Sequence, residues 1–345
     1  MATISESRAA VSFPAPLHQE RDAAALRTVR LLTVVVLVAA PLAALAPVGV
    51  SIATVWLFAG PHNWLECRYF LRRMPARWGA MRTYFLSGIG GAVALAAGFA
   101  ALPWLAERFD FSFAQWERAA AVWNVALGGW VLLLVALRQP LSPARRWPWV
   151  WPLGAALIAA AWIWPRPWSI GLVFAHPLMA LWFLDREFGK FGAEVQAAYR
   201  KTAALVPIAG LLLVAYLADA PPLAGDDVLT SRIAWHAGTD VFSAVSNRCP
   251  VALHVFLETV HYAVWIALLP ALALRGRPWR LADVPLAVRS ASWRRLLGGV
   301  LALGGAITVV LWVGFAVDYP LTRDIYFTAA VLHVLTEIPF LLRLL

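Results

Sequence analysis

The sequence predicts an all-α protein, a polytopic transmembrane helix bundle with about ten spans. Hydrophobic residues make up 61% of the chain and charged residues only 14%, and the mean hydropathy is +0.70. Long apolar runs alternate with short polar connections, and many runs are long enough to cross the roughly 30 Å hydrocarbon core of a bilayer. The chain contains 19 tryptophans, several at predicted helix ends, which is typical of aromatic belts at membrane interfaces.

The helix limits follow from where the apolar runs begin and end. Residues 1–27 are polar, so we expect a flexible cytoplasmic N-terminal tail, followed by a single transmembrane helical domain over 28–345. The first apolar run, from Leu31 to Leu71, is too long for one span, and Pro47 divides it into two helices. The predicted helices cover 29–46, 49–71, 84–105, 116–137, 147–164, 167–185, 202–218, 251–274, 296–317 and 324–345.

The later helix boundaries coincide with turns or charged connections. Mixed charges over 107–117 separate the third helix from the fourth, and the Pro165-Arg166-Pro167 turn joins the fifth helix to the sixth. The longest connection, 219–250, is rich in aspartate, and we expect it to be an external loop. Within it, His236 and Asp240 are expected to form a solvated or loop-capping pair.

The basic residues mark one side of the membrane. Their clusters lie before the first helix and after the second, fourth, sixth, eighth and tenth, whereas the other connections are acidic or nearly uncharged. The positive-inside rule then places both termini in the cytoplasm, and we expect an integral protein of the inner (cytoplasmic) membrane. The net charge of +10 is explained by this topology and does not indicate nucleic-acid binding. The two cysteines give no disulfide framework and no metal-type spacing.

A histidine followed four residues later by a glutamate occurs three times within the apolar helices. The three pairs are His62 and Glu66, His254 and Glu258, and His333 and Glu337. Because four residues make about one helical turn, the two members of each pair lie on one helix face. Away from helix ends, these glutamates are the only carboxylates within the predicted spans. Ionisable groups in such surroundings are expensive to bury and indicate a functional site.

The histidines also share a predicted depth. The second, sixth, eighth and tenth helices all run from outside to inside, with midpoints near residues 60, 176, 262 and 334. The histidines nearest to these midpoints are His62, His176, His261 and His333. We therefore expect four imidazoles from four helices to meet at one level of the bundle, where helix bundles commonly build metal sites.

Imidazoles that converge in this way are suitable ligands for iron, copper, zinc or nickel. The candidate metal ligands are His62, His176, His254, His261 and His333. His254 lies about two turns outward of His261, so it can also belong to an outer shell or an access path. The candidate catalytic residues are Glu66, Glu258 and Glu337, which can either ligate a metal or hold an imidazole N–H. Histidine-only ligation of one metal and mixed ligation of two metals are both compatible with the sequence.

Two motifs resemble a known family. Pro61-His62-x-x-x-Glu66 resembles the Pro-His-x-x-x-acid motif of the Brp/Blh family of membrane-embedded β-carotene 15,15′-dioxygenases, and the stretch 331–343 is similar to that family's last helix. The resemblance implies a multi-helix bundle with histidine-held iron that cleaves a polyene double bond with O2. The chain departs from the family at Asn63-Trp64, where the family has small residues, and in the spacing of the histidines of its eighth helix.

Together these features predict a membrane-embedded non-haem iron oxygenase acting on a lipophilic substrate, polyene-like or lipid, that enters from the bilayer. Copper and zinc are alternative metals. A proton-coupled membrane transporter with an intramembrane His/Glu relay is the alternative function. Broken helices in inverted repeats would favour a transporter, but Pro177 has no symmetric partner in the sequence. An assembly or anchoring protein without enzymatic activity does not explain why the deep acids follow histidines. The sequence leaves the oligomeric state open.

Overall fold

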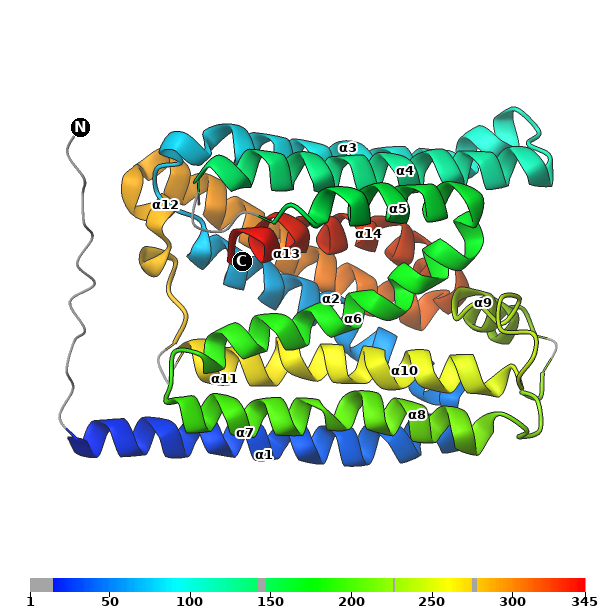
Figure 1. Ribbon diagram of the computed structural model, residues 1–345, viewed down its shortest axis with the longest axis horizontal. Helices are drawn as coiled ribbons and strands as arrows, with labels where there is room; N and C mark the ends of the chain where they lie inside the picture. Colours follow the sequence, from blue (N-terminus) through cyan, green and yellow to red (C-terminus); the bar gives the residue numbers. More distant parts are fainter. Residues whose placement is uncertain (1–14, 142–146, 226, 275–277, 345) are drawn as a thin grey trace.

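The computed structural model describes the whole chain except residues 1–14, 142–146, 226, 275–277 and 345 (Figure 1). The described residues form helices joined by short connections and include no strand, so the predicted all-α class is confirmed. The helices are α1 (Ala15–Leu45), α2 (Pro47–Arg73), α3 (Arg82–Arg108), α4 (Phe113–Arg138), α5 (Val150–Ile163), α6 (Pro165–Phe188), α7 (Ala193–Ala203), α8 (Leu205–Leu217), α9 (Val228–His236), α10 (Arg248–Ala263), α11 (Leu269–Leu274), α12 (Pro285–Arg289), α13 (Ala291–Val317) and α14 (Tyr319–Leu344).

Each of the ten predicted segments contains a helix in the described chain, although the helix within 147–164 begins only at Val150. The predicted helix 202–218 is the second part of a longer rod made by α7 and α8. The predicted helix 251–274 consists of α10 and α11, joined by a π-helical turn at Val264–Leu268. Helix α1 begins at Ala15, so the helix extends into the segment that the polar composition predicted to be a tail.

Eight helical segments of the described chain are long and apolar enough to cross a membrane, as expected for an integral membrane protein. The predicted spans that are not among them are α2 and α5. Helix α5 has only 14 residues. Helix α2 has 27 residues, but His62, Asn63, Glu66 and its terminal arginines lower its hydropathy.

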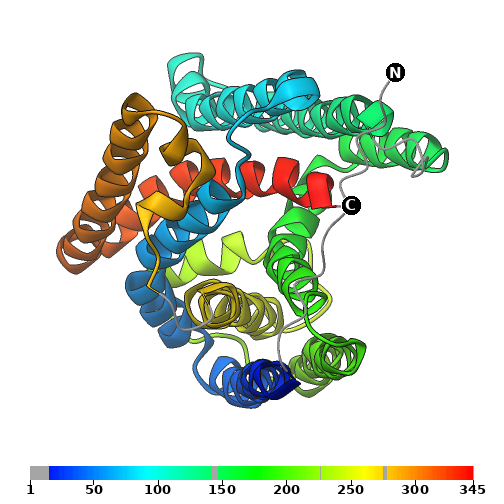
Figure 2. The same ribbon diagram turned by 90° about the vertical axis from the view of Figure 1, so that its left-hand side faces the viewer.

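The four helices with the mid-depth histidines lie around the centre of the bundle. The long helices run roughly along one axis in Figure 1, and Figure 2 looks down them. Helices α2, α6, α10 and α14 surround the middle, with α1 and α7–α8 on one side, α3, α4 and α5 on another, and α13 outside α2. Among the eight apolar segments, the one formed by α10, the π-helical turn and α11 is the most enclosed, with 67% of its most apolar stretch buried against 11% for α13.

The connection 219–250, predicted to be an external loop, contains a helix. It contains α9, whose first turn is capped by Asp227, because the carboxylate accepts hydrogen bonds from the Thr230 backbone N–H at 2.9 Å and from the Thr230 hydroxyl at 2.6 Å. Asp240 does not pair with His236 as expected. It accepts two hydrogen bonds, at 2.9 and 2.8 Å, from the planar guanidinium of Arg166 at the start of α6. Arg166 also lies over the Trp235 ring.

Close packing of α3 against α4 gives a first testable prediction. A Cβ at Gly91 would overlap the Trp130 indole nitrogen, whose N–H donates to the Ser87 carbonyl at 2.9 Å. We expect Gly91→Ala to destabilise the protein by about 1–3 kcal/mol, because overpacking must displace the indole. Thermal unfolding in detergent measures this change.

The neighbouring residue supplies the control. A Cβ at Gly90 would meet nothing within 4 Å, so Gly90→Ala keeps the same helix and the same substitution without the clash. We expect Gly90→Ala to unfold at or slightly above the wild-type temperature, since alanine favours a helix. Equal unfolding temperatures for the two variants would contradict the packing of α3 on α4.

The Arg166–Asp240 pair gives a second prediction, concerning pH. The hydrogen bonds from Arg166 hold the pKa of Asp240 below its ordinary value. The pair therefore stabilises the fold above the unfolded pKa of about 4, and this contribution is lost as the pH falls through the lower folded pKa. Because both side chains are partly exposed, we expect Arg166→Gln to cost only about 0.2–1 kcal/mol at pH 7.

Thermal unfolding of the wild type and of Arg166→Gln at pH 7 and pH 3 measures this effect. The two proteins should differ less at pH 3 than at pH 7, and a smaller difference should remain because Arg166 also donates to the Trp235 carbonyl at 2.8 Å. Arg118→Gln, at an exposed arginine of α4, is the control and should match the wild type at both values. A difference between wild type and Arg166→Gln that is the same at both pH values would show that the carboxylate of Asp240 is not involved.

Candidate metal centre

The four predicted mid-depth histidines meet in the centre of the bundle. The ring centroids of His62 and His261 are 5.4 Å apart, and those of His62 and His333 are 5.2 Å apart. His176 completes the cluster, with its ring centroid 4.6 Å from that of His261 and 5.2 Å from that of His333. The expectation that helices α2, α6, α10 and α14 each contribute one imidazole at a common level is confirmed. We call these four residues the histidine cluster.

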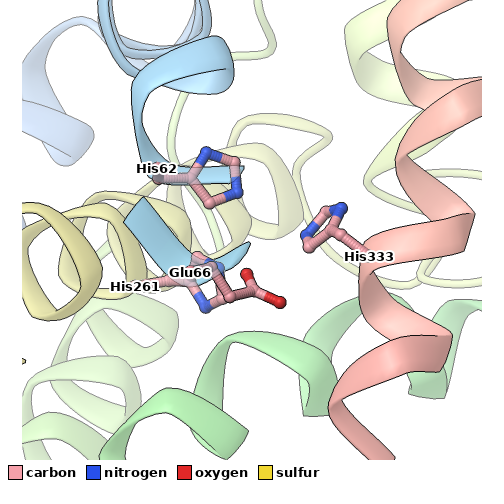
Figure 3. Close-up of side chains that lie close together, drawn as sticks. All are labelled: His62, Glu66, His261 and His333. Atoms are coloured by element: carbon pink, nitrogen blue, oxygen red, sulfur yellow. The ribbon is translucent and has the colours of Figure 1, made fainter. Parts of the chain in front are cut away.

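A glutamate joins three members of the histidine cluster. His62 and Glu66 of α2, His261 of α10 and His333 of α14 point toward one another (Figure 3). Each offers one ligand atom, and all four atoms lie within 4.8 Å of one another, so the group could hold a metal ion. His62, Glu66 and His261 are buried, and His333 is half-buried.

A second group of potential ligands shares His261 with the first. It consists of His176, His261 and Glu337, whose ligand atoms also lie within 4.8 Å of one another. The Glu337 Oε2 is 3.6 Å from the His176 Nδ1, so this carboxylate approaches the imidazole of another helix. The Glu66 and Glu337 carboxyl groups are also close to each other. The arrangement fits either one metal with carboxylates around it or two neighbouring metals.

The spacing of the four rings fits a metal ion. A metal–nitrogen bond of about 2.1 Å places an imidazole centroid about 3.2 Å from the metal, so neighbouring centroids in a four-histidine site lie about 4.5–5.2 Å apart. The four observed separations, 4.6 to 5.4 Å, are close to this range. The ligand atoms of His62, His261 and His333 already lie within 4.8 Å of one another, whereas His176 meets that limit with His261 and Glu337.

Unsatisfied polar atoms support the same interpretation. Both ring nitrogens of His261 and of His333, and both carboxylate oxygens of Glu337, are buried and make no well-formed hydrogen bond in the described chain. The Pro177 and Ala330 carbonyls approach the two imidazoles, and Trp265 and Glu66 approach Glu337. Each such group costs about 1–3 kcal/mol, so several in one place require an explanation. By contrast, the His62 Nδ1 lies 3.0 Å from the Phe58 carbonyl and donates to it, which leaves Nε2 with a free lone pair. A metal ion would accept a lone pair from each of these imidazoles and from the carboxylate.

Local irregularities of the helices position the ligands. Pro61 has no N–H to donate to the Leu57 carbonyl one turn earlier, and the Trp312 indole of α13 donates to it at 3.3 Å instead. At the same turn, Gly60 lets the backbone of α2 approach Thr308, where an added Cβ would lie 3.0 Å from the Thr308 Cα. This close contact fixes the face on which His62 lies. The π-helical turn Val264–Leu268 directly follows the turn that carries His261, and such turns are frequent at functional sites.

The spacing of Glu258 from His254 predicted that Glu258 would orient a histidine, but in the structure it bonds to a tyrosine. Its Oε1 accepts a hydrogen bond from the Tyr262 hydroxyl at 2.8 Å. The Tyr262 ring packs against His62, with centroids 4.6 Å apart, so Glu258 is linked to the histidine cluster through a tyrosine. The prediction placed the acid on the correct helix face but assigned it the wrong partner, because the tyrosine one turn later reaches the carboxylate.

His254 belongs to neither group of potential ligands among the described residues. It is buried farther out along α10, with its ring centroid 5.1 Å from that of His236 and 5.8 Å from that of Phe174. His236, expected to be solvated, packs with its ring centroid 4.4 Å from that of Phe327. Of the five histidines predicted as ligands, the structure therefore brings together four and separates His254.

Two residues near these histidines are not predicted from the sequence. Tyr262 follows His261 directly and forms the link to Glu258 described above. Arg323 precedes the predicted start of the last helix and is only 4% exposed, with its guanidinium over the Phe327 ring and its Nε without a hydrogen-bond partner in the described chain. A basic residue at a predicted helix end is expected at the membrane interface, so nothing in the sequence distinguishes it from an exposed arginine.

Comparisons of the chain with protein-family models, with curated proteins and with solved structures found no match.

Proposed function

We propose that the protein is a membrane-embedded oxygenase in which the histidine cluster holds a non-haem iron ion that acts with O2 on a lipophilic substrate. The observation that carries the proposal is the convergence of four imidazoles from four helices, two of them buried and two half-buried, beside two carboxylates. Such groups are expensive to bury in an apolar bundle unless they coordinate a metal or serve a reaction.

The choice of iron and O2 depends on ligand chemistry and on the sequence resemblance. Imidazole nitrogens are suitable ligands for iron, copper and zinc, so the presence of the histidine cluster alone does not name the metal. The motif from Pro61 to Glu66 and the last helix resemble the Brp/Blh dioxygenases, and this resemblance favours iron and an unsaturated, polyene-like or lipid substrate. Copper and zinc are the alternatives that metal analysis separates from iron.

The chain itself supplies three things to this chemistry. Bound iron would contribute the ability to exchange electrons with O2. The Phe58 carbonyl fixes the ring of His62, and Glu337 lies where it can do the same for His176, which keeps the imidazoles oriented and basic. The apolar residues packed around the cluster exclude water, which protects reactive species from side reactions.

We also infer how the bundle lies in the membrane. Counting α2 and α5 with the eight apolar segments gives ten spans, and the basic connections then place both termini in the cytoplasm. Helix α2 can cross the bilayer despite its polar residues because His62 and Glu66 face the bundle interior, where ionisable groups are tolerated. In a bacterial cell this topology corresponds to the inner membrane, and the bilayer would deliver the lipophilic substrate laterally.

Metal content tests the first part of the proposal. We expect protein purified in detergent after iron-supplemented expression to contain close to one or two iron ions per chain. We expect His261→Ala, which removes the residue common to both potential ligand groups, to lose most of this iron. His254→Ala is the matched control on the same helix and should keep it. Elemental analysis of the three folded proteins measures these contents.

A folded wild type without any transition metal would contradict the metal centre. The buried histidines and glutamates would then be interpreted as a proton relay, and transport assays in vesicles would test the alternative function of a proton-coupled transporter. Stoichiometric copper or zinc in place of iron would retain the metal centre and change the expected reaction.

Oxygen consumption tests the reaction class. We expect the iron-loaded protein to consume O2 in the presence of carotenoid, other polyene or unsaturated lipid substrates, and we expect His333→Ala to lower the rate at least 100-fold. Glu337→Gln should lower metal affinity or rate roughly 10–100-fold, because a carboxylate beside a ligating imidazole tunes the site. Iron bound stoichiometrically with no O2 uptake on any of these substrates would contradict the oxygenase.

A further inference from the structure

A small cavity lies next to the histidine cluster, on the far side of Trp265. The Trp265 ring contacts that of His261, with centroids 6.5 Å apart, and also forms part of the cavity wall. The cavity is partly open and has a volume of about 40 Å³, which is enough for about three water-sized groups. The lining residues used in the argument are Arg68, Tyr69, Arg72, Trp265, Ala273 and Trp279.

The charged groups in the cavity wall are both cations. The guanidinium of Arg68 lies between two indole rings, 4.6 Å from the centroid of Trp64 and 4.8 Å from that of Trp279. No carboxylate of the described chain forms an ion pair with Arg68. Arg72 donates a hydrogen bond to the Ala273 carbonyl at 3.2 Å. The aromatic rings hold the Arg68 charge in a fixed position without neutralising it.

The wall also offers a hydrogen-bond donor and few acceptors. The indole nitrogen of Trp279 is buried and has no hydrogen-bond partner in the described part of the chain. The Tyr69 hydroxyl is already used, because it donates to Glu187 at 2.9 Å. The remaining wall is mostly apolar. A ligand that complements this wall has a small anionic acceptor group on an apolar body.

We propose that this cavity binds the carboxylate of a long-chain fatty acid, with the carboxylate against Arg68 and the hydrocarbon chain along the apolar surface of the bundle. A carboxylate is planar and small enough for the cavity, and it matches the fork geometry of a guanidinium. Arg68 follows His62 by six residues, which is about 9 Å along the helix, so the bound acid begins close to the histidine cluster. That the acid is also the substrate rests on the proposed function, whereas its binding does not.

Binding of radiolabelled palmitate to the purified full-length protein in non-ionic detergent tests the proposal. We expect saturable binding by the wild type, displaced by unlabelled palmitate but not by hexadecanol or hexadecyltrimethylammonium, which lack the negative charge. Arg68→Gln should weaken binding at least tenfold. Arg77→Gln, at an exposed arginine of the same basic segment and outside the cavity wall, should stay within twofold of the wild type.

A second pair of variants tests the cavity itself without changing charge. Ala273→Phe on α11 fills the cavity, whereas Ala271→Phe places the same ring on an exposed position of the same helix. We expect only Ala273→Phe to abolish palmitate binding. Size-exclusion chromatography and thermal unfolding show whether each variant is folded. If Arg68→Gln does not fold, the Ala273→Phe and Ala271→Phe pair still tests the cavity.

Several results would overturn the proposal. Hexadecanol competing as well as palmitate would show that the charge is not recognised, and phosphatidylglycerol competing better than palmitate would identify a lipid headgroup site instead. Unchanged binding in both Arg68→Gln and Ala273→Phe would place the acid elsewhere. Repeating the assay on His261→Ala separates the two proposals, because palmitate binding there should persist whether or not the metal centre exists.

Discussion

The cost of holding unsatisfied imidazoles and carboxylates in an apolar interior is the constraint on which the rest of this structure depends. The ring nitrogens of His261 and His333 and the carboxylate of Glu337 make no well-formed hydrogen bond in the described chain. At about 1–3 kcal/mol for each such group, they would consume much of the stability of an ordinary domain. The surrounding helices keep these groups in place, and the metal ion that we propose would offset the cost of burying them.

The sequence could predict the level at which the histidines meet, because helix midpoints and chain direction follow from hydropathy and from the basic connections. It could not predict which groups face each other across helices. Four-residue spacing fixes the face of one helix, and His62 and Glu66 do join the same ligand group. Glu337, however, approaches His176 of α6 rather than pairing only within α14. Which side chains meet across two helices depends on the rotation of each helix about its axis and on the crossing angle between the helices. The spacing of residues within one helix determines neither.

The same limit explains the errors at the outer end of the bundle. His236 and Asp240 share the four-residue spacing, yet His236 packs against His254 and Phe327, and Asp240 binds Arg166. Polar residues in a connection have many candidate partners, and only the folded arrangement of α6, α9 and α10 selects among them. The π-helical turn after His261 was also invisible in the sequence, because the residues that form it are ordinary helix formers.

Helix α10 connects these separate observations, which explains why it is the most buried of the candidate spans. His254, Glu258, His261 and Trp265 follow one another at spacings of four, three and four residues, so they form one stripe along the helix. His254 contacts His236, and Glu258 accepts a hydrogen bond from Tyr262. His261 belongs to the histidine cluster, and Trp265 forms part of the wall of the cavity beside Arg68. Because a shift of α10 by one residue would rotate all four side chains by about 100°, its register controls every one of these contacts together. The π-helical turn adds a residue to the helix between His261 and the cavity, and it thereby sets how the two ends of the stripe face their separate partners.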